Sequence, residues 1–537
     1  MLKSRLCIAF FAFAVGCAPA QKPLTDYVNP MLGTATLWDS VDLGFKPTKR
    51  TWGAEVFPGS SLPNAMVQVS PVTKFHSGAG YQYEDSVIYG FTHTNKGHWN
   101  LCHIPLLPVT GTPTPGDYCS PFSHERESAA PGYYQVFLDR YGVDAQLSST
   151  LRCAFHKYTY PAGAAACWLA DLPRSNEHVR AWDIRKEGDN VFAGWQQTGE
   201  KMYFYAVANR PVTGIEPVVE GDREVRIVRF GEGDGALELR IGFSFVSEKN
   251  ARENLEAEML GKSFAEVRSE ATATWNDLLG RIRVEGGTER EKGLFYSSLY
   301  RSFLWPALRS DVNGEFTDVD GKVINPGFRY YTGPSYWDDY RNKLILLGML
   351  APDVISSDTD KGEKRGGFMP TFFHGDHASA FVAGTYLRGN RGFDVNRAYN
   401  LVLRNATVQG PSRPWLDEYI AKGYISEMDV ENPVTWTVCK AAVTKTLEYS
   451  YDDYAVALLA DALGDKENHD MLMKRTSNYK NLFDPSTGLM RGRLENGEWI
   501  TPFDDPYPYY EYMYREATAW QQAFFAPHAT EELIAIF

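Results

Sequence analysis

The chain has 537 residues, with 54 Lys and Arg against 67 Asp and Glu, so its formal net charge is −13. An acidic chain without a basic stripe cannot neutralise the phosphates of nucleic acid, so we expect no nucleic-acid partner. Because a single hydrophobic core stops growing at about 250 to 300 residues, the length predicts two large domains. Aromatic residues make up 14% of the chain, which suits the stacking of sugar rings and large β-rich cores equally.

Residues 1–20 are typical of a signal peptide, because Lys3 and Arg5 precede an apolar run at residues 6–15. That run is shorter than the roughly 20 residues of a membrane-spanning helix. Residues 14–17 (Ala-Val-Gly-Cys) resemble a bacterial lipobox, in which Cys17 would be acylated, whereas residues 18–20 (Ala-Pro-Ala) offer an ordinary cleavage site. We expect an exported protein of a Gram-negative bacterium, either periplasmic or anchored to the outer membrane through Cys17, with no other membrane contact.

Five cysteines follow Cys17, and an odd number cannot all pair. The intervals from Cys102 to Cys119 and from Cys153 to Cys167 suit disulfides, but buried free thiols suit cores of this size as well. No spacing resembles a zinc site.

Residues 21–247 have the pattern of short strands interrupted by Gly, Pro and Asn. Apolar and polar residues alternate over residues 237–245, which is the period of two of a half-buried strand, and residues 133–138 and 201–208 are similar. This half is predicted to be an antiparallel β-sandwich.

After the sandwich, residues 248–285 predict a helical linker, and residues 286–537 predict a helical domain. The apolar residues Tyr454, Leu458, Leu459 and Ala462 predict one apolar stripe along a helix that ends at Gly464. Helices joined by long loops indicate a toroid of helical hairpins, whose loops should carry the chemistry. The expected helices are residues 291–308, 339–350, 378–388, 433–449, 452–463 and 468–481.

Acidic side chains beside aromatic ones mark three predicted helix starts. Hydrolysis of a glycosidic bond needs one carboxylic acid to protonate the leaving oxygen and one carboxylate to activate water. Each acidic group has a simpler interpretation as a helix cap or a first-turn charge, and a lone His beside it is usually structural. The three segments are residues 337–341 (Trp-Asp-Asp-Tyr-Arg), 375–377 (Gly-Asp-His) and 516–521 (Glu-Ala-Thr-Ala-Trp-Gln).

Many short motifs together resemble glycoside hydrolase family 92 and occur in that family's order. They extend over nearly the whole chain after residue 27, so the set is highly specific although no single motif is. They include Val28-Asn29-Pro30, Phe57-Pro58-Gly59, Tyr89-Gly90-Phe91-Thr92-His93, Gly375-Asp376-His377-Ala378, Lys445-Thr446-Leu447-Glu448-Tyr449 and Pro527-His528.

The resemblance implies a β-sandwich followed by an (α/α)6 barrel, with an exo-acting site between them that hydrolyses α-mannosides by inversion. It also implies a calcium ion (Ca2+) that engages the sugar, although the metal ligands stay open. Glu516 would be the general acid. Glu55 and Trp99 stand where the family has Gly-rich and His-rich segments, and we assign them to substrate binding as well. The other residues expected to form the pocket for terminal mannose are Trp337, Asp338, Arg341, Asp376 and His377.

The sequence also departs from the family pattern. Ala517-Thr518 replaces the usual Gly-Asn after the acid, and Ala529 replaces an Asp after Pro-His. The family's barrel continues past this point and there supplies paired aspartates as the general base, so we expect an incomplete barrel from a fragment, a truncated product or a split protein. The α-1,2 linkage is the family-weighted choice of substrate. The alternatives are a glycan-binding surface lipoprotein that has lost turnover, and a glycosidase of another specificity.

Overall fold

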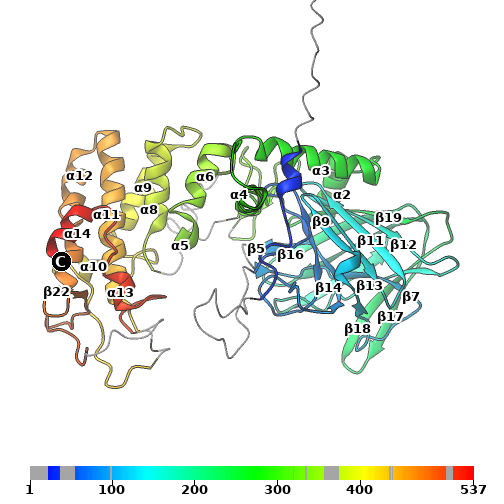
Figure 1. Cartoon of the computed structure of the whole chain (residues 1–537), viewed down its shortest axis with the longest axis horizontal. Helices are drawn as coiled ribbons and strands as arrows, with labels where there is room; N and C mark the ends of the chain where they lie inside the picture. Colours follow the sequence, from blue (N-terminus) through cyan, green and yellow to red (C-terminus); the bar gives the residue numbers. More distant parts are fainter. Residues whose placement is uncertain are drawn as a thin grey trace, which may run out of the picture.

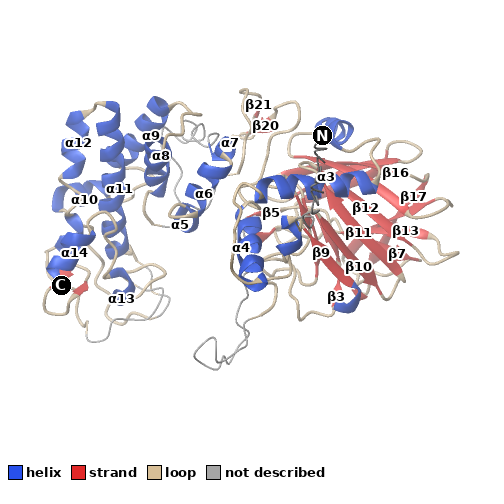
Figure 2. Ribbon diagram, turned by 45° about the horizontal axis from the view of Figure 1, so that its top comes forward, coloured by secondary structure: helices blue, strands red, loops and turns tan. Residues whose placement is uncertain are grey.

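The computed structural model describes residues 22–36, 55–96, 99–318, 320–332, 336–355, 374–434, 437, 439–503 and 512–537. The predicted signal peptide and Cys17 lie outside these residues. Strands gather in one half of the molecule, and the helices after residue 335 form the other half (Figure 1 and Figure 2). The predicted fold class, a β-sandwich followed by helices of an (α/α)6 barrel, is confirmed.

The sandwich consists of two antiparallel sheets. The first has the order β1-β2-β4-β7-β13-β18-β17, and the second has the order β14-β15-β16-β19-β12-β11-β10-β9. The strands of the first sheet, in that order, are Ser60–Ser61, Gln68–Val72, Gly90–Thr92, Leu106–Thr110, Ala166–Ala170, Arg223–Phe230 and Val212–Glu220. Those of the second are Ala181–Lys186, Val191–Gln197, Lys201–Ala208, Leu237–Ser244, Cys153–Thr159, Val143–Ser149, Tyr133–Leu138 and Glu127–Ala130.

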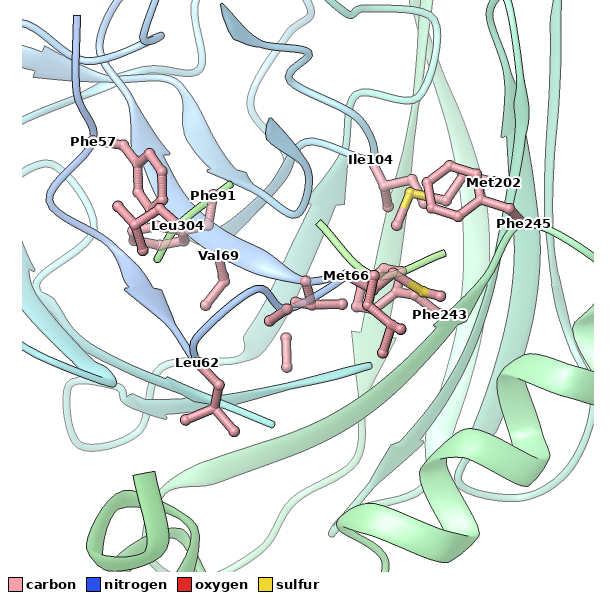
Figure 3. Close-up of a cluster of buried hydrophobic side chains, with 14 of the residues drawn as sticks. Phe57, Leu62, Met66, Val69, Phe91, Ile104, Met202, Phe243, Phe245 and Leu304 are labelled. Carbon is pink, nitrogen blue, oxygen red and sulfur yellow. The ribbon is translucent and has the colours of Figure 1, made fainter. Parts of the chain in front are cut away.

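Alternating side chains form the sandwich core. Along β16, buried residues alternate with partly exposed ones, as the period of two predicts. Side chains of the two sheets meet between them, and the rings of Trp168 on β13 and Phe192 on β15 lie 5.6 Å apart. Figure 3 shows part of this cluster, in which Phe91 and Phe243 come from opposite sheets. The three strands predicted at residues 133–138, 201–208 and 237–245 are therefore confirmed.

Three helices follow the sandwich: α2 (Glu248–Glu258), α3 (Phe264–Leu279) and α4 (Glu289–Ser302). The side chain of Ser263 accepts a bond from the backbone of Glu266, whose carboxylate reaches back to the backbone of Ser263, so a capping box starts α3. Helices α2 and α3 lie within residues 248–285, where the sequence predicts a helical linker, and α4 follows them.

The junction between the sandwich and the later helices is buried and polar. Asp311 accepts hydrogen bonds from Ser244 Oγ at 2.7 Å, Asn250 Nδ2 at 2.9 Å and Asn254 Nδ2 at 2.7 Å. Leu304, which follows α4, lies among sandwich side chains in Figure 3, and its carbonyl accepts a bond of 2.6 Å from Gln68 on β2. Satisfied buried donors and acceptors of this kind join the two halves over a continuous core.

The helical half is built of short helices around one long helix, α11. None of its described helices is long and apolar enough to cross a membrane. The helices are α5 (Tyr336–Asp339), α6 (Lys343–Leu350), α7 (Pro352–Ile355), α8 (His377–Leu387), α9 (Val395–Thr407), α10 (Leu416–Lys422), α11 (Ala442–Leu463), α12 (Lys466–Met473), α13 (Ala519–Gln522) and α14 (Thr530–Ile536).

Helix α11 corrects two predictions. The expected helices at residues 433–449 and 452–463 are one continuous helix that begins at Ala442, where the carboxylate of Glu427 accepts the backbone N–H of Ala442 at 2.9 Å. The predicted apolar stripe is also wrong, because Leu458 is only partly buried whereas Asp452 and Asp453 are completely buried. A helix surrounded by neighbours has no solvent face to give it an amphipathic pattern. Gly464 does end the helix in the left-handed conformation, with φ 83°.

All five cysteines after Cys17 are free thiols, so neither of the two disulfides that the spacing allowed is formed. Burial raises the pKa of the Cys102 and Cys153 thiols well above the ordinary range. These side chains therefore act as small apolar groups in the core.

Candidate active site

The first residues of α8 are held by a dense set of hydrogen bonds. Asp376 occupies the N-cap position, but its carboxylate makes no cap bond. It accepts instead from Ser379 Oγ at 2.6 Å, Asn405 Nδ2 at 2.8 Å and Arg413 Nε at 3.1 Å. The interpretation of Asp376 as a simple N-cap is therefore wrong, because its oxygens are turned toward α9 and the segment before α10.

Arg413 is completely buried between two carboxylates. Its Nη1 lies 2.6 Å from Asp453 Oδ1 on α11, and its Nε bonds Asp376 on the other side. Asp453 also accepts from Arg475 Nη2 at 2.9 Å and from Tyr419 OH at 3.3 Å. Buried charges persist when each one is paired and hydrogen-bonded, as these are. Arg413, Asn405 and Asp453 were not predicted as site residues.

Helix α11 presents two more buried carboxylates to the start of α8. Glu448 Oε2 lies 2.9 Å from His377 Nε2, and Asp452 Oδ2 accepts the backbone N–H of Asp376 at 2.6 Å. Glu448 and Asp452 are four residues apart and so share one helix face. The four-residue spacing of these acids is present in the sequence, but the prediction placed them on two separate helices and did not foresee their burial.

The pKa values of these groups follow their surroundings. Burial disfavours the charged form of His377, but the adjacent Glu448 carboxylate outweighs it and raises the pKa of His377 above its usual value. Burial raises the pKa of Asp452 to about 8 and that of Asp376 above its ordinary range, although Arg413 partly opposes this. The His377–Glu448 pair is therefore expected to be ionic at neutral pH, with Asp452 protonated.

Aromatic rings and one arginine surround His377. The ring of Tyr340 lies 4.4 Å from that of His377, and the ring of Trp337 lies edge-on to it at 5.4 Å. Arg341 is half exposed, and its Nη2 lies 4.0 Å from Glu448 Oε1. Asp338 is exposed on α5. The structure thus brings together four of the predicted pocket residues, which are Trp337, Arg341, Asp376 and His377.

An open groove begins at this cluster. It has a volume of about 830 Å³, and its wall includes Tyr340, Arg341 and Tyr451. Arg388 and Asn390 line it farther along. Grooves of this size accept small ligands, and aromatic faces with fixed cationic donors suit sugar rings and hydroxyls.

A buried lysine lies one turn before Glu448 on α11. Lys445 Nζ donates to His374 Nδ1 at 2.5 Å, which requires a neutral imidazole. Burial lowers the pKa of Lys445 to about 8 and the pKa of His374 to about 3, the latter with the help of the nearby Lys445 and Arg515 charges. The sequence analysis names Lys445 within a family motif but gives it no role, and it does not name His374.

Glu516 lies beside the first turn of α11. The backbone N–H of Arg515 donates to Thr444 Oγ1 at 2.9 Å. Thr444 and Glu448 are four residues apart, which places their side chains roughly 5–6 Å from one another on a helix. The backbone at residues 515–516 therefore lies beside α11, one helical turn before Glu448. Glu516 is partly buried, with φ 51°, a left-handed conformation that is uncommon for a residue other than Gly and that recurs at functional sites.

Glu55 and Trp99 lie on the sandwich and not on the helices that carry His377. Glu55 also has a positive φ, 48°, and its carboxylate packs against Gly78. Trp99 is in β6 (Trp99–Asn100), which pairs with β5 (Asn95–Lys96). Figure 1 shows β5 at the edge of the sandwich nearest the helical half.

A His–Glu pair flanked by aromatic rings and a half-exposed arginine, in a helical domain that follows a β-sandwich, is the arrangement expected of a glycoside hydrolase. The profile of the glycosyl hydrolase family 92 catalytic domain matches residues 250–537, and that of the family's N-terminal domain matches residues 27–253. The chain belongs to glycosyl hydrolase family 92.

Solved structures share this architecture. A family GH92 α-mannosidase from Bacteroides thetaiotaomicron is 26% identical, with a TM-score of 0.85 over 96% of this chain and 74% of its own. An inverting GH92 mannosidase from the same organism is 24% identical with a TM-score of 0.82, over 96% of this chain and 72% of its own, and shares the fold. An uncharacterised secreted glycosidase from Arthroderma benhamiae is 24% identical over 95% of this chain and 71% of its own.

The side chains of the described residues do not form a calcium site by themselves. They contain no group of three or more His, Cys, Asp and Glu placed to hold a metal. The carboxylates near His377 are engaged, since Asp376 and Asp453 bond Arg413 and Glu448 bonds His377. Because calcium requires six to eight oxygen ligands, these residues do not fit the ion.

Proposed function

We propose that the protein is an exo-acting α-mannosidase that removes terminal α-linked mannose from glycans with inversion, α-1,2 linkages being the first choice. The observation that carries the proposal is the strained turn at Glu516, whose neighbour Arg515 bonds Thr444 one helical turn before Glu448 of the His377–Glu448 pair. The similarity to an α-mannosidase, of which a second structure contains mannoimidazole, supports mannose as the sugar.

In this proposal Glu516 is the general acid. As the bond between the anomeric carbon and the glycosidic oxygen breaks, the Glu516 proton passes to that oxygen. A water molecule attacks the anomeric carbon from the opposite face and gives its proton to a second carboxylate, which we do not assign.

The residues around His377 would hold the terminal sugar. Arg341 presents a half-exposed guanidinium beside the Trp337 and Tyr340 rings. Guanidinium N–H groups donate to sugar hydroxyls, and an aromatic ring covers the apolar face of a pyranose. Asp338 on α5, and Glu55 and Trp99 on the sandwich edge, are proposed to complete the pocket from its other sides.

The calcium requirement is a separate proposal, because the described side chains do not fit the ion alone. Its test is the loss of mannosidase activity on chelation and its return with added Ca2+. Activity that is unchanged after exhaustive chelation would remove calcium from the account.

Export is also part of the proposal. The predicted signal peptide and the secreted glycosidase of Arthroderma benhamiae support it. Acylation of Cys17 is tested by palmitate labelling, which should occur in the wild type and vanish in Cys17→Ala.

The decisive experiment compares two matched variants on α-linked mannobiosides. Glu516→Gln should lose activity by about 10²- to 10⁴-fold, the usual contribution of general acid catalysis. Glu531→Gln, an exposed glutamate on nearby α14, should behave like the wild type. An active Glu516→Gln protein would overturn the acid assignment. Calorimetric binding of mannosides without any hydrolysis by the wild type would favour the glycan-binding alternative.

A further inference from the structure

Helix α8 is held at its N-terminus through both backbone and side chain. Asp452 accepts the Asp376 N–H, and Arg413 bonds the Asp376 carboxylate, while the next residue, His377, carries its ring to Glu448. All five side chains are at least 95% buried. The direction of the His377 ring therefore depends on groups that lie beneath it and face away from the groove.

The fully buried charges of this cluster balance when Asp452 is protonated, and the half-exposed Arg341 lies at the edge of the cluster, 4.0 Å from Glu448 Oε1. The carboxylates of Asp376, Glu448 and Asp453 oppose the cations of Arg413, Arg475 and a protonated His377. An ionised Asp452 would add a further negative charge to a completely buried site, which burial disfavours. A protonated Asp452 leaves the cluster neutral.

We propose that Arg413 and Asp452 are positioning residues, which act through Asp376 to fix the His377–Glu448 pair, and that Asp452 does so in its protonated form. Only the activity readout of this proposal rests on the proposed function. Burial raises the pKa of Asp452, in agreement with it. The charged groups that face Asp452 are His377 and Asp376 on α8, Arg413 before α10, and Glu448 on α11, while Tyr340 approaches from α5.

Two substitutions at Asp452 distinguish the role of its hydrogen-bond acceptor from the role of its charge. Asp452→Asn keeps a carbonyl oxygen that can accept the Asp376 N–H and cannot ionise, so it imitates the protonated acid. Asp452→Ala removes the acceptor and leaves that N–H unpaired. We expect kcat within about threefold of the wild type for the Asn variant and a loss of about 10²-fold for the Ala variant, the size that small misplacements cost.

The cleanest readout does not require turnover. In protein with ¹³C-labelled histidine, the His377 signal, assigned with His377→Gln, gives the imidazole pKa directly. We expect the raised pKa of His377 to persist in Asp452→Asn and to fall toward the ordinary value in Asp452→Ala and in Arg413→Lys, since a looser α8 start separates the ring from Glu448. Tyr399→Phe, which loses a bond of 2.9 Å to Asp465 elsewhere in the helical half, is the matched control for stability.

Two results would overturn the proposal. The first is a His377 pKa that is unchanged in both Asp452→Ala and Arg413→Lys. The second is an Asp452→Asn protein as impaired as Asp452→Ala, which would show that the charge of Asp452 is needed. If the wild type does not cleave mannosides, the proposed function is wrong. The measured pKa of His377 in the variants then still decides whether Asp452 and Arg413 position the ring.

Discussion

Two buried clusters, one in each half of the molecule, hold their titratable groups in opposite ways. In the sandwich, His93 Nδ1 lies 3.0 Å from the carbonyl of Ile104 and so must donate, which makes His93 Nε2 the acceptor of a bond of 3.0 Å from His156 Nε2. His156 Nδ1 then accepts from Tyr158 OH at 2.6 Å. Every member of this chain is neutral, whereas the cluster around Arg413 is ionic.

The comparison of the two buried clusters indicates what each one contributes to its half of the molecule. Hydrogen bonds suffice for a neutral chain in a rigid sheet core, which then serves as scaffold. An ionic cluster costs more to bury, and it fixes groups whose direction matters for a ligand. The ionic cluster lies directly beneath the candidate site, and the neutral one lies inside the other domain.

Removing the central cation of the ionic cluster should have the largest effect on stability. Arg413→Met leaves Asp376 and Asp453 buried with one partner fewer, so we expect a loss of about 3–5 kcal/mol in the free energy of unfolding. Arg185→Met, which breaks pairs at the surface, should cost under about 1 kcal/mol. Urea unfolding measures both, and equal losses would contradict the comparison.

Acid should specifically destabilise the neutral hydrogen-bonded series His93–His156–Tyr158 in the sandwich. Burial lowers the pKa of His93 to about 3 and the pKa of His156 well below its usual value. The unfolded chain therefore binds these protons more tightly, so the stabilisation is complete above about pH 6.5 and declines by about 1.4 kcal/mol per pH unit for each histidine as the pH falls. Hydrogen exchange, corrected for its intrinsic rate, should accelerate in β12 between pH 6 and pH 5 and less in α8. Unchanged protection of β12 would refute this.

Removing one hydrogen-bond donor from the neutral series should lower the free energy of unfolding less than breaking the ionic cluster does. Tyr158→Phe leaves His156 Nδ1 without a partner in a dry core, for which we expect about 1–3 kcal/mol. Tyr203→Phe, on the partly buried side of β16, should change little. Thermal unfolding of the two variants gives the difference, and a stabilised Tyr158→Phe would show that the hydroxyl is not needed.

The smallest effect is expected at a surface pair that belongs to neither cluster. Lys22 and Glu289 lie 3.3 Å apart with both side chains largely exposed. Glu289→Gln should shift the free energy of unfolding by at most about 0.5 kcal/mol, and this shift should disappear at high salt. A larger change would mean that exposed pairs matter here as much as buried ones.

The sequence predicts the strands of the sandwich well, because residues such as Leu237, Leu239 and Ile241 alternate with polar neighbours on a sheet with one buried face. It predicts α11 poorly. Sequence patterns predict that Asp452 and Asp453 are exposed to solvent. Asp453 is buried against Arg413, some 40 residues away, and against Arg475, while Asp452 accepts the backbone N–H of Asp376. The pairing of distant charges has no local signature. The motifs located Asp376, His377 and Glu448, but the structure revealed that Glu448 pairs with His377 and that Arg413 pairs with Asp376.

The central claim is inverting hydrolysis of α-mannosides with Glu516 as the acid. Proton NMR of the sugar released from an α-mannobioside, recorded before mutarotation, tests it most directly. The account predicts β-mannose as the first product of the wild type and no product from Glu516→Gln on the same time scale. Release of α-mannose first, or of any mannose at the wild-type rate by Glu516→Gln, would contradict it.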